Sequence, residues 1–264
     1  MHWLSACGQR ARGIAIVALV GFALMACSQQ QLQQSGQALA ISPQQAQAMG
    51  VETWQRILQE RGRSEDQAAQ SRLQALGQRL LAANGLDAGA WEFAVLKGEE
   101  INAFALPGGK VGVYEGMLKV AQTDDQLATV IGHEIGHVTE RHGAQRVGLA
   151  QTANLGLQAI SAALDAGQIA YANQIAAVLG AGVQYGIVMP YSRTQELEAD
   201  RTGLNFMARG GYDPSQAVTF WQEMAKAGGG GPPGFLSTHP SNQQRIQAIQ
   251  RLLPEAQALY ARSR

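Results

Sequence analysis

The stretch LATVIGHEIGHVTERHG (residues 127–143) places two histidines and a glutamate inside an otherwise apolar run. Thr123 and Gln126 have capping-box spacing, so we expect a helix that follows this cap and runs to the end of the stretch. His133 and His137 share one face of that helix, because residues four apart differ by about 40° around the axis. The pattern favours a metal site over a helix with two incidental histidines.

Glu134 lies next to His133, at the edge of the histidine face. Two histidines at this spacing with an intervening glutamate are typical of zinc hydrolases, in which the carboxylate is the general base for the attacking water. A catalytic zinc ion usually takes a third protein ligand. His142 follows His133 by nine residues, about 180° around the same helix. We therefore expect His142 to point away and to have a structural or supporting role near the helix C-terminus.

A second motif, SRTQELEAD (residues 192–200), supplies a candidate for the third ligand. It predicts a helix in which Glu196 and Asp200 share one face, while Glu198 lies about 200° from Glu196. Glu196 is then placed to ligate zinc, and Asp200 to accept a hydrogen bond from a ligand imidazole. A solvated charged face is the alternative, and spacing alone does not choose between the two.

The chain from residue 49 to 264 predicts one α+β domain that is mainly helical. Ser64 and Gln67 have capping-box spacing ahead of leucines at helical intervals. Three strand-like runs separated by GEE and PGG then predict a small antiparallel β-meander, at residues 91–97, 101–106 and 110–114.

The first 26 residues have the features of a lipoprotein signal peptide. An uncharged apolar run, residues 13–26, follows a basic flank and is shorter than the roughly 20 residues that span a membrane. It ends in LMAC, which resembles a bacterial lipobox and implies acylation of Cys27. An ordinary signal peptide or an uncleaved anchor is the alternative. Residues 27–48 are glutamine-rich and are expected to form a flexible tether, or else a polar start to the first helix.

Composition narrows the classes of partner. The chain has 20 basic and 20 acidic residues, whereas nucleic-acid-binding proteins normally carry a basic excess, so no nucleic acid is expected as a partner. Residues 150–190 are rich in Ala and Gly but are interrupted by Gln and Asn. We expect this segment to form a helical pair beside the active site rather than a membrane span.

Four motifs together resemble one known family. HEIGH, SRTQELEAD, NAFALPGG (102–109) and THPSNQQR (238–245) are similar to the HtpX and CAAX-prenyl-protease family of gluzincin metallopeptidases. The resemblance covers residues 65–250 and implies a zincin-type domain with an HExxH active-site helix and one Zn²⁺ per chain. It also implies roles for single residues: zinc ligands His133, His137 and Glu196, general base Glu134, and Asp200 as the acid that closes the ExxxD motif.

The soluble bacterial branch of that family contains periplasmic lipoproteins. With Ser28 after Cys27, the resemblance implies a lipid anchor on the periplasmic face of the outer membrane of a Gram-negative cell. The expected function is a zinc-dependent endopeptidase of the cell envelope that hydrolyses misfolded or membrane-associated proteins. Two alternatives remain open: a chaperone-like lipoprotein with latent or structural zinc, acting with envelope assembly machinery, and a housekeeping oligopeptidase.

Some residues are candidates for handling the substrate. An extended substrate is expected to pair with an exposed strand edge, at Asn102, Ala103, Phe104 and Ala105. Three side chains are alternative stabilisers of the oxyanion, namely Tyr191, Arg193 and Arg245.

His239 follows a loop rich in Gly and Pro, residues 228–234. A neutral imidazole is a good zinc ligand. His239 is therefore a candidate regulatory ligand that swings in, fills the open zinc position and holds the enzyme latent. The alternative is a histidine that only anchors its loop beside Pro240.

Overall fold

The computed structural model describes residues 41–150, 155, 158, 191–227, 234–240 and 243–263. The chain divides into two compact units, one of residues 1–41 with 145–188 and one of residues 42–144 with 189–264. The expected signal peptide, Cys27 and most of the tether lie outside the described residues, as does nearly all of the segment 150–190. Within the described part, no helix is both long and apolar enough to cross a membrane.

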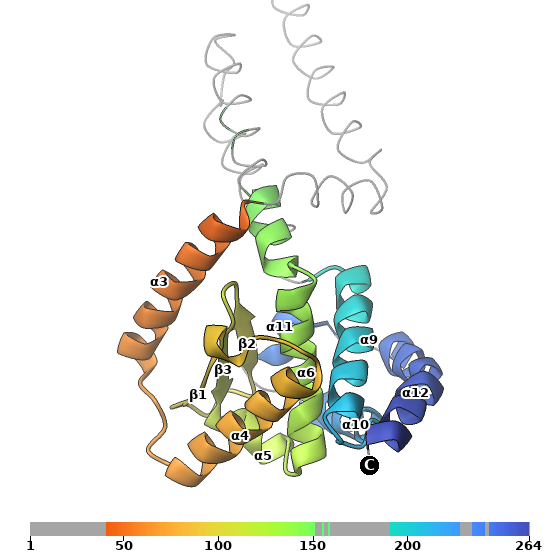
Figure 1. Ribbon diagram of the computed structural model, residues 1–264. Helices are drawn as coiled ribbons and strands as arrows, with labels where there is room; N and C mark the ends of the chain where they lie inside the picture. Colours follow the sequence, from red (N-terminus) through yellow and green to blue (C-terminus); the bar gives the residue numbers. More distant parts are fainter. Residues whose placement is uncertain are drawn as a thin grey trace, which may run out of the picture. The chain divides into compact units, whose positions relative to one another are not determined.

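The second unit is mainly helical and contains a small three-stranded sheet, which confirms the expected α+β class (Figure 1). Its strands are β1 (Glu92–Leu96), β2 (Ala103–Leu106) and β3 (Lys110–Tyr114). The helical elements around the sheet are α3 (Pro43–Arg61), α4 (Gln67–Ala83), the 3₁₀ turn η1 (Ala88–Ala90), α5 (Glu115–Val120), α6 (Asp124–Thr139), α9 (Arg193–Arg209), α10 (Gln216–Ala227), α11 (Phe235–Thr238) and α12 (Gln243–Ser263).

The sheet is mixed, so the predicted antiparallel meander is wrong. The strand order is β1-β3-β2, with β1 parallel to β3 and β2 antiparallel to β3. Gly108 and Gly109 have φ values of 84° and 75° and form the tight turn between β2 and β3, but the segment between β1 and β2 is not a hairpin. Strand β2 therefore stays at one edge of the sheet, as the substrate-pairing hypothesis requires.

Helix α3 was not expected to start as early as it does. Its capping box joins Ser42 and Gln45, and the helix begins at Pro43. Residues 43–48 are therefore helical. For these six residues the alternative expectation, a polar start to the first helix, describes the structure better than a flexible tether. Gly50 lets α3 approach the β2–β3 turn, since a Cβ there would lie 1.9 Å from the carbonyl oxygen of Pro107.

The N-cap of helix α4 lies two residues after the predicted one. Asp66, not Ser64, is the N-cap and accepts a hydrogen bond from the backbone N–H of Ala69. The Ser64 hydroxyl instead donates to Glu115 at 2.5 Å.

Helix α6 starts at the predicted capping box of Thr123 and Gln126, but it ends earlier than expected. The α-helix stops at Thr139, and Arg141 adopts a left-handed φ of 59° before a new helical segment starts at His142. His142 therefore does not continue the α6 geometry. The prediction that it points away is wrong, because its Nδ1 lies 3.0 Å from Nδ1 of His137, whereas this contact agrees with the expected supporting role.

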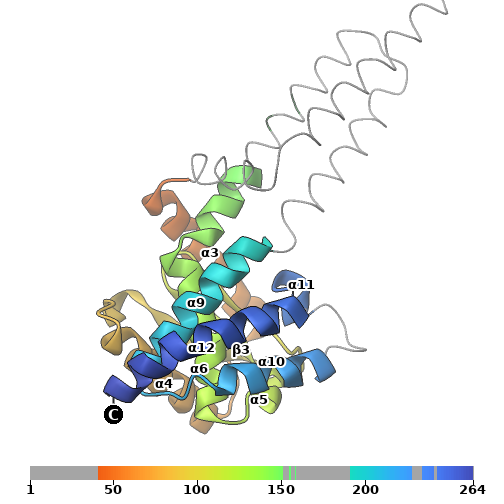
Figure 2. The same cartoon turned by 90° about the vertical axis from the view of Figure 1, so that its right-hand side faces the viewer.

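Helices α6 and α9 pack at unusually close range (Figure 1). A Cβ on Gly203 would lie 2.7 Å from the backbone nitrogen of His133, and one on Gly136 would lie 3.0 Å from the carbonyl oxygen of Ala199. Small residues on both helices thus allow their backbones to touch. Helix α12 packs against α9 (Figure 2).

Replacing Gly203 with Ala tests this packing. The added methyl group forces backbone atoms apart, so we expect the free energy of unfolding to fall by about 1–3 kcal/mol. Chemical denaturation followed by circular dichroism measures this change. Gly143→Ala is the control, because its Cβ would meet only the ring of Pro107 at 3.4 Å. Equal stability of the two variants would contradict the close-packing account.

Candidate metal centre

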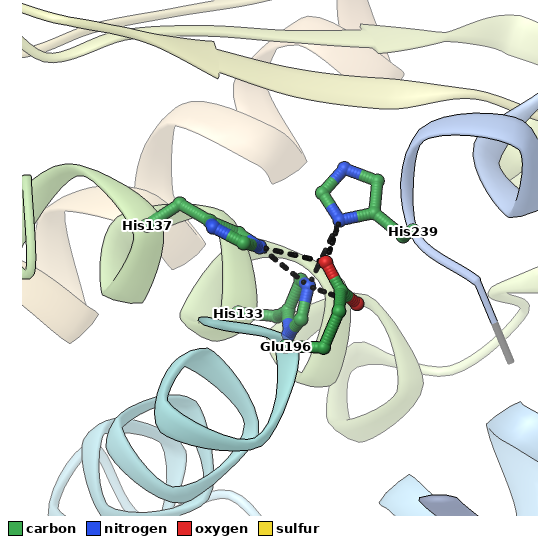
Figure 3. A group of neighbouring side chains, drawn as sticks. All are labelled: His133, His137, Glu196 and His239. Carbon is green, nitrogen blue, oxygen red and sulfur yellow. Dashed lines mark hydrogen bonds and ion pairs between the residues drawn. The ribbon is translucent and has the colours of Figure 1, made fainter. Parts of the chain in front are cut away.

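Four buried side chains converge at the α6–α9 contact (Figure 3). His133 and His137 come from α6, Glu196 from the first turn of α9, and His239 from the end of α11. One ligand atom of each lies within 4.8 Å of the others. We call these four residues the metal cluster.

The spacing within the metal cluster fits one tetrahedral ion. Nε2 of His133 lies 3.0 Å from Nε2 of His137 and 3.1 Å from Nδ1 of His239. Oε1 of Glu196 lies 3.4 Å from Nε2 of His137 and 3.1 Å from Nδ1 of His239. Zinc–ligand bonds of about 2.0–2.1 Å in a tetrahedron place ligand atoms roughly 3.4 Å apart. Imidazole and carboxylate donors suit Zn²⁺, so these residues fit a zinc ion.

Glu134 points into the same region and is 1% exposed. Its Oε1 atom is buried and accepts no hydrogen bond among the described residues, and it lies 3.4 Å from Nε2 of His239. A buried carboxylate oxygen without a donor is costly unless a water or substrate group supplies one. The structure thus places an unfilled hydrogen-bond acceptor beside the metal cluster.

Asp200 orients His133 from the same face of α9 as Glu196. Its Oδ1 lies 2.9 Å from Nδ1 of His133, the contact that the four-residue spacing predicts. Arg245 on α12 donates to both Asp200 oxygens at 2.7 Å and also pairs with Glu196. Its guanidinium lies 3.8 Å from the centre of the Trp221 ring.

These contacts keep both carboxyl groups ionised. Burial alone would raise the pKa of Glu196, but the charge of Arg245 and hydrogen bonds from His137 and His239 hold it well below its usual range. The pKa of Asp200 is also lowered, because Arg245 and His133 outweigh the effect of burial. Burial lowers the pKa of His137 and so favours the neutral ring that a metal requires.

The three oxyanion candidates occupy different positions. Arg245 is 5% exposed and its guanidinium bonds to Asp200 and Glu196, so it serves the two carboxylates. Arg193 is exposed at the start of α9. Tyr191 stacks on His137 with ring centres 3.9 Å apart. Arg245 and Tyr191 both contact the metal cluster, Arg245 through the carboxylates and Tyr191 through the ring of His137.

Two residues of this region have contacts that helical spacing did not predict. His142 is fully buried, and its Nδ1 atom lies 3.0 Å from Nδ1 of His137. Its Nε2 atom lies 3.1 Å from Oε2 of Glu198, the acid that spacing placed away from Glu196. The left-handed conformation of Arg141 makes this return possible, and no sequence pattern signalled it.

A cavity of about 300 Å³ opens beside the metal cluster. Its lining includes His137 and Tyr191, together with Ala105 of β2, Pro107 and Ala46 of α3. Asn102, just before β2, has a buried side-chain oxygen without a partner among the described residues. The cavity, the edge strand and the metal cluster thus adjoin one another.

Comparison with known proteins places the chain in a family. The model of "Peptidase family M48" matches residues 67–253, which include every residue of the metal cluster. The chain belongs to peptidase family M48. The gluzincin relationship expected from HEIGH and SRTQELEAD is confirmed at this level, and α3 lies before the matched segment.

Similar proteins come from fungi, bacteria and animals. The mitochondrial metalloendopeptidase OMA1 of Schizosaccharomyces pombe is 38% identical over 181 residues, 68% of this chain and 51% of that protein. The beta-barrel assembly-enhancing protease of Escherichia coli K12 is 32% identical over 183 residues, 66% of this chain and 37% of the relative. Human OMA1 is 34% identical over 174 residues, 63% of this chain and 33% of the relative. The M48 chain therefore spans about half the length of these relatives or less.

Replacing Arg245 with Met tests the electrostatic support of the metal cluster. Two buried carboxylates lose their counterion, so we expect the free energy of unfolding of the metal-free protein to fall by about 3–5 kcal/mol at pH 7. The exposed Arg251 on the same helix supplies the control, Arg251→Met.

The pH dependence of this effect follows from the lowered carboxyl pKa values. Their stabilisation is fully present above the unfolded carboxyl pKa and is lost as pH falls toward the folded values. The difference between the parent protein and Arg245→Met should therefore shrink below about pH 4. A difference that grows on acidification, measured by denaturation from pH 7 to 2.5, would contradict this assignment.

Proposed function

We propose that this chain is a zinc-dependent endopeptidase acting on protein substrates. The observation that carries the proposal is the buried metal cluster with Glu134 beside it, in a chain of family M48. His133, His137 and Glu196 would hold the zinc ion. Zinc, when bound, polarises the scissile carbonyl and lowers the pKa of a bound water.

Glu134 is the general base in this proposal. Its unpartnered Oε1 can accept the proton of the attacking water and then deliver that proton to the leaving amine. Asp200 holds His133 in the tautomer whose Nε2 faces the metal cluster, and Arg245 keeps Asp200 ionised. Tyr191 is the remaining candidate to stabilise the oxyanion.

An extended substrate strand is proposed to lie along the edge of β2. Within Asn102, Ala103, Phe104 and Ala105, the backbone groups of Ala103 and Ala105 would supply the main-chain hydrogen bonds, which make weak demands on sequence. The backbone of Asn102 already bonds to Glu100 and Tyr114. The side-chain oxygen of Asn102 can accept a substrate N–H, which would satisfy a buried group that lacks a partner. The adjoining cavity, lined largely by Ala, Pro and Gly, fits one apolar substrate side chain.

We further propose that the described conformation is latent. His239 lies within the metal cluster and would occupy the ligand position that the attacking water needs. It stacks on Phe235 with ring centres 4.3 Å apart, so loop anchoring and zinc ligation act together. Residues 228–233 of the loop ahead of it lie outside the described residues.

The proposed location is the periplasmic face of a bacterial outer membrane, with a lipid anchor at Cys27. This proposal rests on the lipobox-like LMAC sequence and on the glutamine-rich segment that follows it. One relative is named a beta-barrel assembly-enhancing protease, and envelope assembly machinery is accordingly a proposed partner. The chaperone-like alternative, in which zinc is latent or structural, gains support from the closed cluster.

Substitutions at two glutamates test the catalytic proposal. Glu134→Gln should keep zinc and lose about 10²–10⁴-fold in casein cleavage, because the base is removed and the ligands stay. Glu196→Gln should lose zinc. Metal analysis and a casein digest measure both properties. Full activity of Glu134→Gln in a zinc-loaded protein would instead favour the chaperone-like alternative.

Removing His239 tests latency. His239→Ala should raise basal casein cleavage while zinc content stays at one per chain, because the position for the attacking water opens. Unchanged cleavage would leave His239 with the loop-anchoring role alone. Reduced cleavage at full zinc would show that His239 assists substrate or transition-state binding.

Replacing Cys27 with Ser tests the anchor. We expect the protein to move from the membrane fraction to the soluble fraction with unchanged activity on casein, because acylation requires the thiol sulfur. Density-gradient fractionation of cells measures this. A Cys27→Ser protein that remains in membranes would point to an uncleaved anchor.

A further inference from the structure

A chain of two side chains leads from the metal cluster to the protein surface. Nδ1 of His137, the ring nitrogen that faces away from the cluster, lies 3.0 Å from Nδ1 of His142. Nε2 of His142 lies 3.1 Å from Oε2 of Glu198, whose side chain is 50% exposed. We call His142 and Glu198 the outer pair.

Counting hydrogens fixes which atom donates and which accepts in these two hydrogen bonds. If His137 ligates a metal through Nε2, that atom carries no hydrogen and the neutral ring must be protonated at Nδ1. Nδ1 of His142 must then accept, so a neutral His142 carries its hydrogen on Nε2. The Glu198 carboxylate, which only accepts, is the partner that this hydrogen needs. Each contact then has one donor and one acceptor.

We propose that the outer pair positions His137 and fixes the tautomer in which its Nε2 lone pair faces the metal. The inference rests on the proposed zinc site and adds two residues to it. Without the carboxylate, His142 can hold its hydrogen on Nδ1 instead, which would force His137 to carry a hydrogen on Nε2. That arrangement blocks ligation.

The other histidine of α6 has the same support in a shorter form. His133 reaches the Asp200 carboxylate directly, at 2.9 Å, whereas His137 reaches Glu198 through the imidazole of His142. Carboxylates that accept from ligand imidazoles typically change metal affinity 10–100-fold when removed. Both acids lie on α9, so one helix orients both histidines of α6.

The backbone is shaped for this contact. Helix α6 ends at Thr139, and the left-handed Arg141 turns the chain so that His142 returns to His137. Glu140 accepts a hydrogen bond from the Thr202 hydroxyl at 2.9 Å, which ties the turn to α9. His142 is therefore held between α6 and α9 rather than extending α6 into solvent.

Zinc affinity of the full chain tests the outer pair. Glu198→Ala should raise the zinc dissociation constant about tenfold, measured by competition with a chromophoric chelator. Glu255→Ala is the matched control, because Glu255 is also 50% exposed but pairs with Arg201 away from the cluster. Equal dissociation constants for Glu198→Ala and the parent protein would overturn the proposal.

Two substitutions at His142 separate positioning from packing. Gln can accept from His137 and donate to Glu198, so His142→Gln should keep zinc affinity within about threefold of the parent value, whereas His142→Phe should weaken it about 10–100-fold. Adding Glu198→Ala to His142→Phe should cause no further loss of zinc affinity, because the hydrogen bonds from His137 to Glu198 are already broken. Additive losses, or equal affinities of the Gln and Phe variants, would assign His142 a packing role alone.

The absorption spectrum of the Co²⁺-substituted protein gives a readout that does not depend on fold stability. The Glu198→Ala variant should show shifted d–d bands, and the Glu255→Ala variant should match the parent protein. Failure of the proposed zinc site is distinguishable, because Glu196→Gln would then bind zinc as tightly as the parent protein. If the zinc site is correct but the outer pair has no role, Glu196→Gln loses zinc while the Glu198 and His142 variants bind it as tightly as the parent protein.

Discussion

The direct backbone contact between α6 and α9 is the constraint on which the metal cluster depends. The carboxylate of Glu196 lies 3.4–3.6 Å from Nε2 of His133 and of His137 only because the two helices touch. Gly203 and Gly136 leave no room for a Cβ at this contact. Overpacking costs stability, and here the same added volume would also move the acids of α9 away from the histidines of α6. The packing of α6 on α9 and the ligand positions of the metal cluster therefore depend on the same glycines.

Charge is the second constraint, because the close contact buries two acids. Glu196 and Asp200 are 2% and 4% exposed, and unpaired buried charges are strongly destabilising. Arg245 offsets that cost from α12 by pairing with both, and the ring of Trp221 covers its guanidinium. Helix α12 contributes no cluster ligand, but it supplies the positive charge that stabilises the two buried acids.

Helical periodicity predicted the parts of the site that depend on neighbours along one helix. It placed His133 with His137 and Glu196 with Asp200, and the caps at Thr123 and Ser192 followed from local patterns. It failed where tertiary contacts decide. The left-handed turn at Arg141 and the insertion of β3 between β1 and β2 depend on distant partners. The outer pair was missed for the same reason, since a continued α6 would have carried His142 away. The early start of α3 does have a local signal, the Ser42–Gln45 capping box, which the tether interpretation passed over.

The central claim is that the metal cluster holds one zinc ion through imidazole and carboxylate groups. Zinc K-edge X-ray absorption of the full chain loaded with one equivalent of zinc tests it most directly. The account predicts four nitrogen or oxygen ligands at about 2.0–2.1 Å, with the outer-shell scattering of two or three imidazoles. A spectrum with sulfur ligands, or one without imidazole scattering, would contradict it.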